Sequence, residues 1–360
     1  VTAKKPDRVI VLDTRVTGKD GRAIADGEAE VLAPETKVRI EGPDIPGLLV
    51  ESHQHFDRLL EKAEGLEPLV TAVVAPEEAA ALGGALLAAR HGIITPILIG
   101  ARDRIESVAE EEGDDLSGVE IIDIPDHAEA AARAVALARD GKAGAVMKGH
   151  LHTSDLLAAV VDKDGGLRTG RRLSHVFVMD VPGLDHMLFV TDAAVNILPD
   201  LEEKVDITQN AIDLALSLGI EQPKAGIISA VETVSPKIPS TLDAAALSKM
   251  ADRGQIRGGL VDGPLAMDNA VDVNAARTKG IISRVAGHAD ILVAPNMEAG
   301  NMLAKELTFV AHAEAAGIAL GARVPVILTS RSDGEKARLA SCAIAALYHD
   351  WQRKGGQGTT

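Results

Sequence analysis

The sequence predicts an α/β protein of two lobes built on mostly parallel sheets. Its 360 residues exceed the length of one average domain, so two cores or one divided core are expected. Apolar residues make up 46% of the chain and aromatic residues only 2%, which indicates a core of Ala, Val, Leu and Ile. Short apolar runs alternate with helical patterns along most of the chain, and this alternation is typical of parallel strands joined by crossover helices.

Residues 1–45 differ from the rest and predict a β-hairpin arm. Two strand-like stretches, residues 9–12 and 28–31, flank a turn that contains Gly18, Asp20 and Gly21. A hairpin standing alone is only marginally stable in water. This arm therefore needs a partner surface, either the main body of the chain or another domain.

The alternation that follows predicts strands and helices in regular succession. Strands are expected at residues 70–74, 95–99, 119–124, 143–147, 176–181, 188–190, 224–229, 259–261, 291–294 and 324–329. Helices are expected at residues 47–64, 76–90, 103–111, 127–139, 201–218, 240–253 and 335–348. In such a fold, ligands bind at the carboxyl ends of the strands.

Composition excludes several classes of function. The 53 acidic residues exceed the 37 basic ones by 16, so nucleic acid and anionic membrane surfaces would be repelled. No apolar run approaches the ~20 residues of a membrane helix, and the amino terminus lacks a signal-peptide pattern, so a soluble, cytoplasmic protein is expected. The single cysteine, Cys342, lies in an apolar helical run and is interpreted as core filler rather than as a nucleophile.

Two polar stretches place cations and hydroxyls beside predicted strands. In residues 148–154, KGHLHTS, Lys148 and Thr153 would stand near a helix start, where backbone N–H groups can hold phosphate oxygens; an ordinary capped helix is the alternative. Residues 166–175, GLRTGRRLSH, carry three arginines within five residues. Guanidinium offers paired donors to phosphate, so this is a local anion trap or, alternatively, a solvated basic loop.

Three further stretches follow later strands. Residues 262–270, DGPLAMDNA, place two carboxylates across a Gly-Pro turn, where they would bind a cation, fix a cleft loop or cap a helix. In residues 296–301, NMEAGN, Asn301 would cap or line the entrance of a helix, with Lys305 one turn on. Residues 328–333, LTSRSD, place Ser330 and Arg331 at a strand's carboxyl end, which suits a tetrahedral oxyanion and a phosphate.

Together and in this order, DGPLAMDNA, MEAGN and LTSRSD resemble the phosphate acetyl/butyryltransferase family over about residues 47–349. The resemblance implies the fold of isocitrate and isopropylmalate dehydrogenases and a homodimer. It assigns residues 46–164 and 321–360 to lobe I and residues 165–320 to lobe II. The arm resembles the final hairpin of a MaoC-type enoyl-CoA hydratase, which implies the transferase part of a bifunctional protein with a fused or associated hydratase module. Hydratase activity is not expected from the arm alone, and a local β-arm is the plainer interpretation.

The reaction that the resemblance implies is acyl-CoA plus phosphate giving acyl phosphate plus CoA, with no metal and no cofactor. Acetyl is the expected acyl group, and butyryl stays open. The expected catalytic residues are Ser330, Arg331 and Asp333. The expected substrate-binding residues are Lys148, Thr153, Arg168, Thr169, Ser174, His175, Asp268, Asn269, Glu298, Asn301 and Lys305.

Two departures from the acetyltransferase branch leave parts of the mechanism open. Where that branch has a catalytic aspartate, seven positions after Ser330, this chain has Ala337. The candidate proton acceptors are Asp333, Glu335, His175 and His152. The helix after Lys148 lacks the branch's arginine and is apolar at residues 156–161, which shifts phosphate capture to the arginine stretch: Arg168, Arg171 or Arg172.

Two rival functions remain. A β-decarboxylating dehydrogenase of the same fold would need a metal-binding aspartate cluster, and no such cluster occurs at helical spacing. A catalytically weakened scaffold that partners a hydratase is the second rival, because the aspartate is missing.

Overall fold

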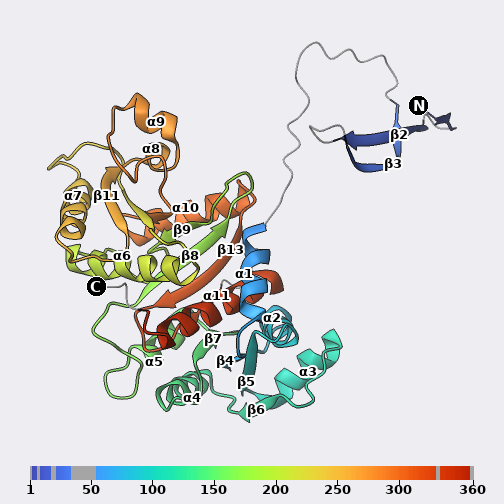
Figure 1. Cartoon of the computed structure of the whole chain (residues 1–360). Coiled ribbons are helices and arrows are strands. Elements are labelled where there is room, and N and C mark those ends of the chain that lie inside the picture. Colours follow the sequence, from blue (N-terminus) through green and yellow to red (C-terminus); the bar gives the residue numbers. More distant parts are fainter. Residues whose placement is uncertain (1, 6–8, 18–21, 34–53, 330–332, 357–360) are drawn as a thin grey trace. The chain divides into compact units, whose positions relative to one another are not determined.

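The computed structural model describes residues 2–5, 9–17, 22–33, 54–329 and 333–356 (Figure 1). Backbone contacts divide the chain into two compact units, Val1–Leu49 and Val50–Thr360. The first contains a three-stranded sheet and the second an eleven-stranded sheet. The two-lobe boundaries expected inside the second unit stay a prediction, because contacts group residues 50–360 as one body.

The small unit contains the expected antiparallel hairpin with a short third strand. Strands β1 (Ala3–Lys4), β2 (Val9–Thr17) and β3 (Ala23–Leu32) pair in the order β1-β2-β3. The ladder runs from Val9 opposite Leu32 to Thr17 opposite Ala23, so it is longer than the apolar residues alone predicted. Pairing continues through polar residues because backbone hydrogen bonds do not depend on side-chain type. The expected turn residues Gly18, Asp20 and Gly21 lie outside the described residues.

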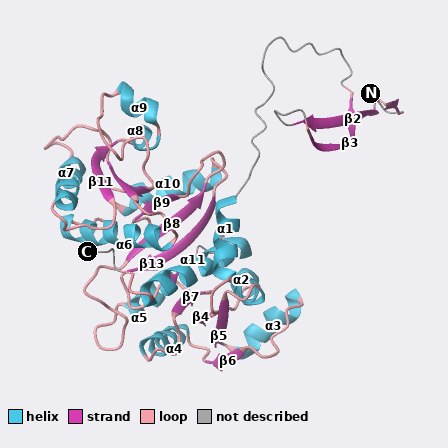
Figure 2. Cartoon of the chain, in the orientation of Figure 1, coloured by secondary structure: helices cyan, strands magenta, loops and turns pink. Residues whose placement is uncertain are grey.

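The large unit alternates strands and helices, as expected (Figure 2). Its strands are β4 (Leu69–Val74), β5 (Ile94–Gly100), β6 (Glu120–Asp123), β7 (Ala145–Lys148), β8 (Ser174–Asp180), β9 (Leu188–Thr191), β10 (Lys224–Ile228), β11 (Leu260–Leu265), β12 (Ile291–Val293), β13 (Glu314–Leu320) and β14 (Val326–Ile327). Its helices are α1 (Gln54–Glu64), α2 (Ala79–Arg90), α3 (Arg102–Glu112), α4 (His127–Arg139), α5 (Thr153–Val160), α6 (Leu201–Ser217), α7 (Pro239–Asp252), α8 (Met267–Val271), α9 (Val273–Thr278), α10 (Met297–Phe309) and α11 (Glu335–Arg353). The part of the first helix expected at residues 47–53 lies outside the described residues.

The sheet is mostly parallel, as predicted. It contains one strand, β13, that the sequence did not predict. The strand order is β11-β10-β12-β9-β8-β13-β14-β7-β4-β5-β6. Among the described strands of this large sheet, the antiparallel pairs are β8 with β9, β8 with β13 and β13 with β14. The unpredicted strand β13 lies in the middle and joins the two halves of the sheet. One continuous sheet therefore passes through both expected lobes.

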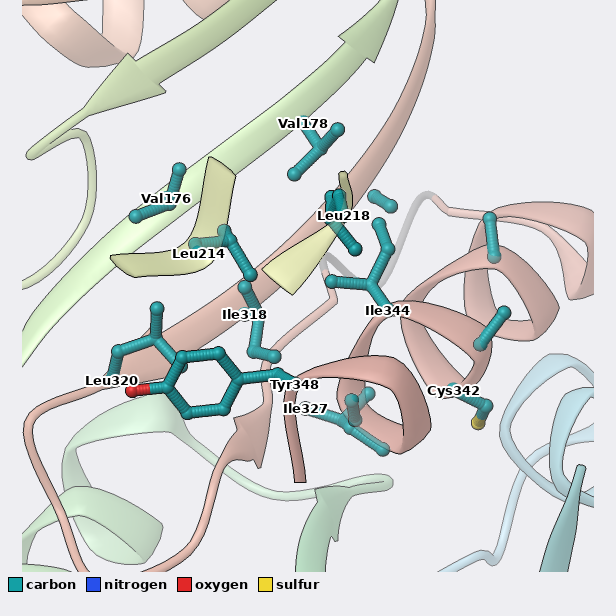
Figure 3. Close-up of a cluster of buried hydrophobic side chains, with 14 of the residues drawn as sticks. Val176, Val178, Leu214, Leu218, Ile318, Leu320, Ile327, Cys342, Ile344 and Tyr348 are labelled. Atoms are coloured by element: carbon teal, nitrogen blue, oxygen red, sulfur yellow. The ribbon is translucent and has the colours of Figure 1, made fainter. Parts of the chain in front are cut away.

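Helices cover both faces of the sheet, and alternate strand residues pack against different helices. In β4, Val73 belongs to a cluster with residues of α1, α2 and α11, whereas Ala72 and Val74 belong to a cluster with residues of α4 and α5. Figure 3 shows part of the first cluster, in which Ile344 of α11 lies near Ile318 of β13. The buried side chains are overwhelmingly aliphatic, as the composition predicted.

Several helices begin where a side chain satisfies the free backbone N–H groups of the first turn. Asp126 accepts hydrogen bonds from the amides of Ala128 and Glu129 at the start of α4. Asp200 and Glu203 form a reciprocal capping box at the start of α6. These local signals explain why the helix boundaries follow the sequence pattern closely here.

Cys342 is core filler, as predicted. Its thiol is fully buried on α11, and this burial raises the pKa of the thiol to about 12, so the reactive thiolate is scarce at neutral pH. Within the described ranges, no helix is both long enough and apolar enough to cross a membrane.

Candidate active site

Two neighbouring parallel strands bring distant functional loops to one edge of the sheet. Strand β14 pairs with β7 through Val326 with Val146 and Ile327 with Met147. The chain beyond β14 therefore emerges beside Lys148, the last residue of β7. The adjacent Gly149 must be small, because a Cβ atom there would lie 2.3 Å from the carbonyl oxygen of Ala75.

A cavity of about 200 Å³ lies at the end of β14. Five of its lining residues are among those expected from the sequence: Thr153, His175, Asn301, Lys305 and Asp333. They come from the start of α5, from β8, from α10 and from the segment before α11. The cavity thus joins segments that are far apart in the chain and that the sequence motifs connected only by resemblance.

Sequence reasoning missed other residues of this cavity. Phe177 follows His175 by two positions on β8 and therefore points to the same face, so strand alternation was an available signal. Thr308 and Phe309 follow Lys305 on α10 at helical spacing. Thr329 precedes Ser330 directly, and only its position inside the LTSRSD motif pointed to it.

His175 is the buried titratable group of the cavity wall. Its side chain packs edge-on against Phe177, and its Nε2 lies 3.3 Å from the carbonyl oxygen of Leu328. A carbonyl only accepts hydrogen bonds, so Nε2 carries the proton and Nδ1 of the neutral ring is an acceptor, which has no partner among the described residues. Burial is the largest influence on the pKa of His175 and lowers it, while the charges of Asp192 and Asp333 act in the opposite direction. The imidazole is therefore neutral at neutral pH.

The carboxylate of Asp192 fixes a tight loop beside α10. It accepts hydrogen bonds from the backbone amides of Ala194, Val195 and Asn196. Asn301 is oriented by this loop, because its Nδ2 donates to the carbonyl oxygen of Ala193 at 3.0 Å. Of the two roles expected for Asn301, capping a helix or lining its entrance, capping is wrong.

The cap of α10 is Asn296, whose side chain accepts from the amide of Ala299. Asn301 lies one turn further along the helix and instead lines the cavity. The cap requires an acceptor three residues before its amide donor, and Asn296 has that position.

A second cavity, of about 400 Å³, lies beside the arginine stretch. One wall is apolar and comes from α5 through Leu157 and Val160; Arg168, Arg171 and Arg172 also line it. Two of these arginines have protein partners. Arg171 pairs with Asp213, and Arg172 Nη2 lies 3.0 Å from Glu203 Oε1.

Arg168 is the arginine of this cavity that forms no ion pair with any described residue. Its side chain is exposed at the cavity wall. Its neighbour Thr169 does not line this cavity, and the Thr169 hydroxyl donates to the carbonyl oxygen of Gly321. The free guanidinium that an anionic ligand would meet here is therefore that of Arg168.

The remaining expected residues lie outside these cavities. Ser174 is fully buried and accepts a hydrogen bond from Asn210, and Lys148 is buried with its Nζ 3.3 Å from the carbonyl oxygen of Gly149. Asp268 and Glu298 are exposed in the first turns of α8 and α10, whereas Asn269 is fully buried. Ser330 and Arg331 lie outside the described residues, so their assignments stay predictions.

Comparison with known proteins identifies the family. Residues 126–346 match the family model described as "Phosphate acetyl/butaryl transferase". A phosphate acetyltransferase from Rhizobium meliloti is 59% identical over 293 residues, which are 81% of this chain and 93% of that protein. The chain belongs to this family. All lining residues of the 200 Å³ cavity fall inside the matched segment.

Two further proteins resemble this transferase. A phosphate butyryltransferase from Clostridium acetobutylicum is 44% identical over 81% of this chain and 97% of that protein. The crystal structure of a branched-chain phosphotransacylase from Enterococcus faecalis V583 superposes with a TM-score of 0.69 at 30% identity. The superposed residues make up 78% of this chain and 99% of the solved chain. The fold of the transferase is thus shared with a solved phosphotransacylase.

Proposed function

We propose that this transferase is a phosphate acetyltransferase, which converts acetyl-CoA and phosphate into acetyl phosphate and CoA. The observation that carries the proposal is the convergence of Thr153, His175, Asn301, Lys305 and Asp333 on one cavity. This occurs in a chain that is 59% identical to a phosphate acetyltransferase.

The reaction needs two anionic substrates held together and one proton transferred. An oxygen of hydrogen phosphate attacks the thioester carbonyl carbon, the C–S bond breaks with its electron pair on sulfur, and the proton of the hydrogen phosphate passes to the thiolate. Lys305 supplies positive charge at the cavity wall, and by motif Arg331 and Ser330 bind the phosphoryl group and stabilise the tetrahedral centre. Asp333 is the proposed group that accepts the proton of the phosphate and returns it to sulfur, and in the reverse direction it accepts the thiol proton; His175 is the alternative, because both line the cavity.

Helix α5 contributes to the walls of both cavities, and CoA is proposed to span them along this helix. Thr153 at the start of α5 lines the smaller cavity, and Leu157 and Val160 of the same helix line the larger one. At about 1.5 Å per residue these positions are roughly 6–11 Å apart along the helix. The thioester would lie near Asp333, and the phosphate groups of CoA would lie near Arg168, which meets the need for a local cation in an acidic protein.

Acetyl is proposed over butyryl because the relative with 59% identity is an acetyltransferase and the butyryltransferase is at 44%. One methylene changes discrimination by only about 1–3 kcal/mol, so the butyryl thioester remains a competing substrate. Initial rates with acetyl-, propionyl- and butyryl-CoA rank them directly.

Further parts of the proposal follow the family resemblance. We propose the two-lobed isocitrate dehydrogenase-like arrangement, a cytoplasmic homodimer, and a reaction without metal or cofactor. Large apolar side chains exposed on and beside α10, which suit a dimer contact, are Ile197, Leu198, Met302, Phe309 and Val310. The arm at residues 1–45 is proposed as the end of a hydratase module.

The test of the proposed function is phosphate-dependent cleavage of acetyl-CoA by the purified chain. Free thiol and acetyl phosphate are measured in parallel, and the proposal predicts their formation in a 1:1 ratio only when phosphate is present. Thiol release without phosphate would indicate a thioesterase instead. If neither product forms, the alternative that the chain is a catalytically weakened scaffold for a hydratase would be favoured.

A further inference from the structure

Arg338 of α11 is a buried cation at the junction of two strand ends. Its side chain is only 1% exposed. Its Nη1 lies 2.6 Å from the hydroxyl oxygen of Thr329 and 3.4 Å from the carbonyl oxygen of Lys148. Thr329 follows β14 and Lys148 ends β7, so one guanidinium joins the carboxyl ends of both strands.

The fold makes room for this side chain at a cost. A Cβ atom at Gly84 of α2 would lie 2.7 Å from both Cβ and Cδ of Arg338, and one at Gly83 would lie 2.5 Å from Glu335 Oε1. Glycine inside a helix destabilises it relative to alanine, and a buried guanidinium loses its hydration. Helix α11 packs on α2 at this point (Figure 1). Any side chain at position 338 needs the glycine at position 84, because the clash includes Cβ, but only the guanidinium brings a charge into the core, which a leucine would avoid.

The contacts of Arg338 indicate a function for its buried guanidinium. Thr329 and Asp333 both line the 200 Å³ cavity, and they are the described residues on either side of Ser330, Arg331 and Ser332. Burial lowers the pKa of Arg338, and the charge of Asp333 is the first influence that opposes this effect. The guanidinium is thus linked to Thr329 by a hydrogen bond and to Asp333 by charge.

We propose that Arg338 is a positioning residue for acyl transfer, which holds Thr329 and Asp333 at the cavity by joining β14 to β7. Arg338 acts through these two residues and does not itself line the cavity. The kinetic consequence rests on the proposed function, whereas the structural consequence does not.

The experiment compares Arg338→Met with a matched loss of a buried cation, Lys204→Met. Lys204 is 5% exposed on α6, pairs with Asp243 at 2.6 Å and does not line the cavity. Amide hydrogen exchange of residues 326–337 and the kinetics of acetyl-CoA phosphorolysis are measured for both. Arg338→Met is expected to raise exchange in this segment and to lower kcat by about 100-fold, because small misplacements of reacting groups cost about that much. KM for acetyl-CoA should change less than about twofold.

Three further results separate positioning from general destabilisation. Lys204→Met should lower thermal stability but leave the exchange of residues 326–337 and kcat near wild type. Millimolar guanidinium ion should restore part of kcat to Arg338→Ala, because it can refill the site of the lost side chain. Unchanged exchange in Arg338→Met, or a kcat loss no larger than that of Lys204→Met, would overturn the proposal. If the wild type shows no phosphorolysis, the proposed function fails, and hydrogen exchange alone decides the positioning role.

Discussion

The imidazole of His175 reaches Leu328 across an intervening strand, with Nε2 3.3 Å from the carbonyl oxygen of Leu328. His175 lies on β8 and Leu328 follows β14, and β13 pairs with both strands. The contact passes over Gly317 of β13, where a Cβ atom would lie 2.1 Å from the Leu328 oxygen and 3.0 Å from His175 Nε2. The missing side chain of Gly317 therefore permits the contact that orients His175 in the cavity wall.

Gly317→Ala is expected to damage both stability and activity. The added methyl group forces Leu328 and His175 apart, and overpacking of this kind costs about 1–3 kcal/mol of unfolding free energy. Urea unfolding and acetyl-CoA phosphorolysis measure the two effects. The matched control is Gly65→Ala, where the nearest atom would lie at an ordinary 3.5 Å. Wild-type stability in Gly317→Ala would show that the strands move apart freely.

The buried His175 is expected to make stability depend on pH. Its pKa in the folded protein lies below the unfolded value, so the unfolded chain takes up the proton first. Stability is therefore complete above about pH 6.5 and falls as the pH decreases toward the folded pKa, by at most about 1.4 kcal/mol per pH unit.

His175→Gln should flatten this dependence in urea unfolding between pH 7.5 and 5.5. A smaller slope should remain, because partial burial also lowers the pKa of His349. A variant slope equal to that of the wild type would mean that the His175 pKa is the same in both states.

The success of the sequence predictions differed between elements for physical reasons. Helix α4 begins and ends where expected because Asp126 is a clear cap and the alanine-rich pattern stops at Arg139. Strand β13, EAAGIAL, was missed because its alanines favour helix and its place between two strands is decided by tertiary packing. The unpredicted central strand is the one that carries Gly317.

In the candidate site too, some residues were predictable from local sequence, whereas others depend on tertiary packing. Thr153, Asn301, Lys305 and Asp333 were found because they follow strands in polar motifs, and the sheet brings those ends together. Arg338 was missed because an arginine in the first turn of a helix, beside Glu335 and Lys336, gives no local sign of burial. Its role depends on Thr329, which is close only in the folded chain.

Arg168→Gln is expected to weaken binding of CoA without altering the chemical step. Loss of a charge-assisted hydrogen bond should raise KM for acetyl-CoA about tenfold or more, while kcat stays near wild type. With acetyl-pantetheine, which lacks the nucleotide, wild type and variant should be equal. Arg133→Gln is the control, because Arg133 is exposed on α4 and forms no ion pair with any described residue.

Binding can be followed without turnover. Trp351 is the single tryptophan and lines a neighbouring cavity with Arg171, so its fluorescence reports on the arginine stretch. Equal CoA affinities for Arg168→Gln and wild type would show that the nucleotide part of CoA binds somewhere other than at Arg168.

Asp333→Asn is expected to lower kcat by about 100-fold, because general base catalysis typically contributes at least that factor. Thermal stability should fall, because the charge of Asp333 offsets the burial of Arg338, although the cap residue of α11 is Gly334; kcat is therefore compared below the unfolding transition of the variant. Glu335→Gln is compared with it, because Glu335 lies two residues away and is a rival candidate for the proton acceptor; this variant should keep its activity if Asp333 is the base. Full activity in Asp333→Asn would transfer the role to Glu335 or a histidine, or remove the need for a protein base.

The most direct test of the central claim is to fill the small cavity with a side chain. Thr308 lines it, and its hydroxyl donates within α10 to the carbonyl oxygen of Ala304 at 2.9 Å. Thr278 on α9 makes the same four-residue contact with Asn274 at 2.8 Å and lies outside the cavity. The two threonines therefore form a matched pair for replacement by phenylalanine.

Phosphate-dependent release of CoA from acetyl-CoA is measured in both variants after their folding is verified by thermal unfolding. If acyl transfer takes place in this cavity, Thr308→Phe loses at least about 100-fold in kcat/KM, as expected when reacting groups are displaced. Thr278→Phe keeps the wild-type value. A folded Thr308→Phe protein with wild-type kcat and KM would contradict the assignment of this cavity as the active site.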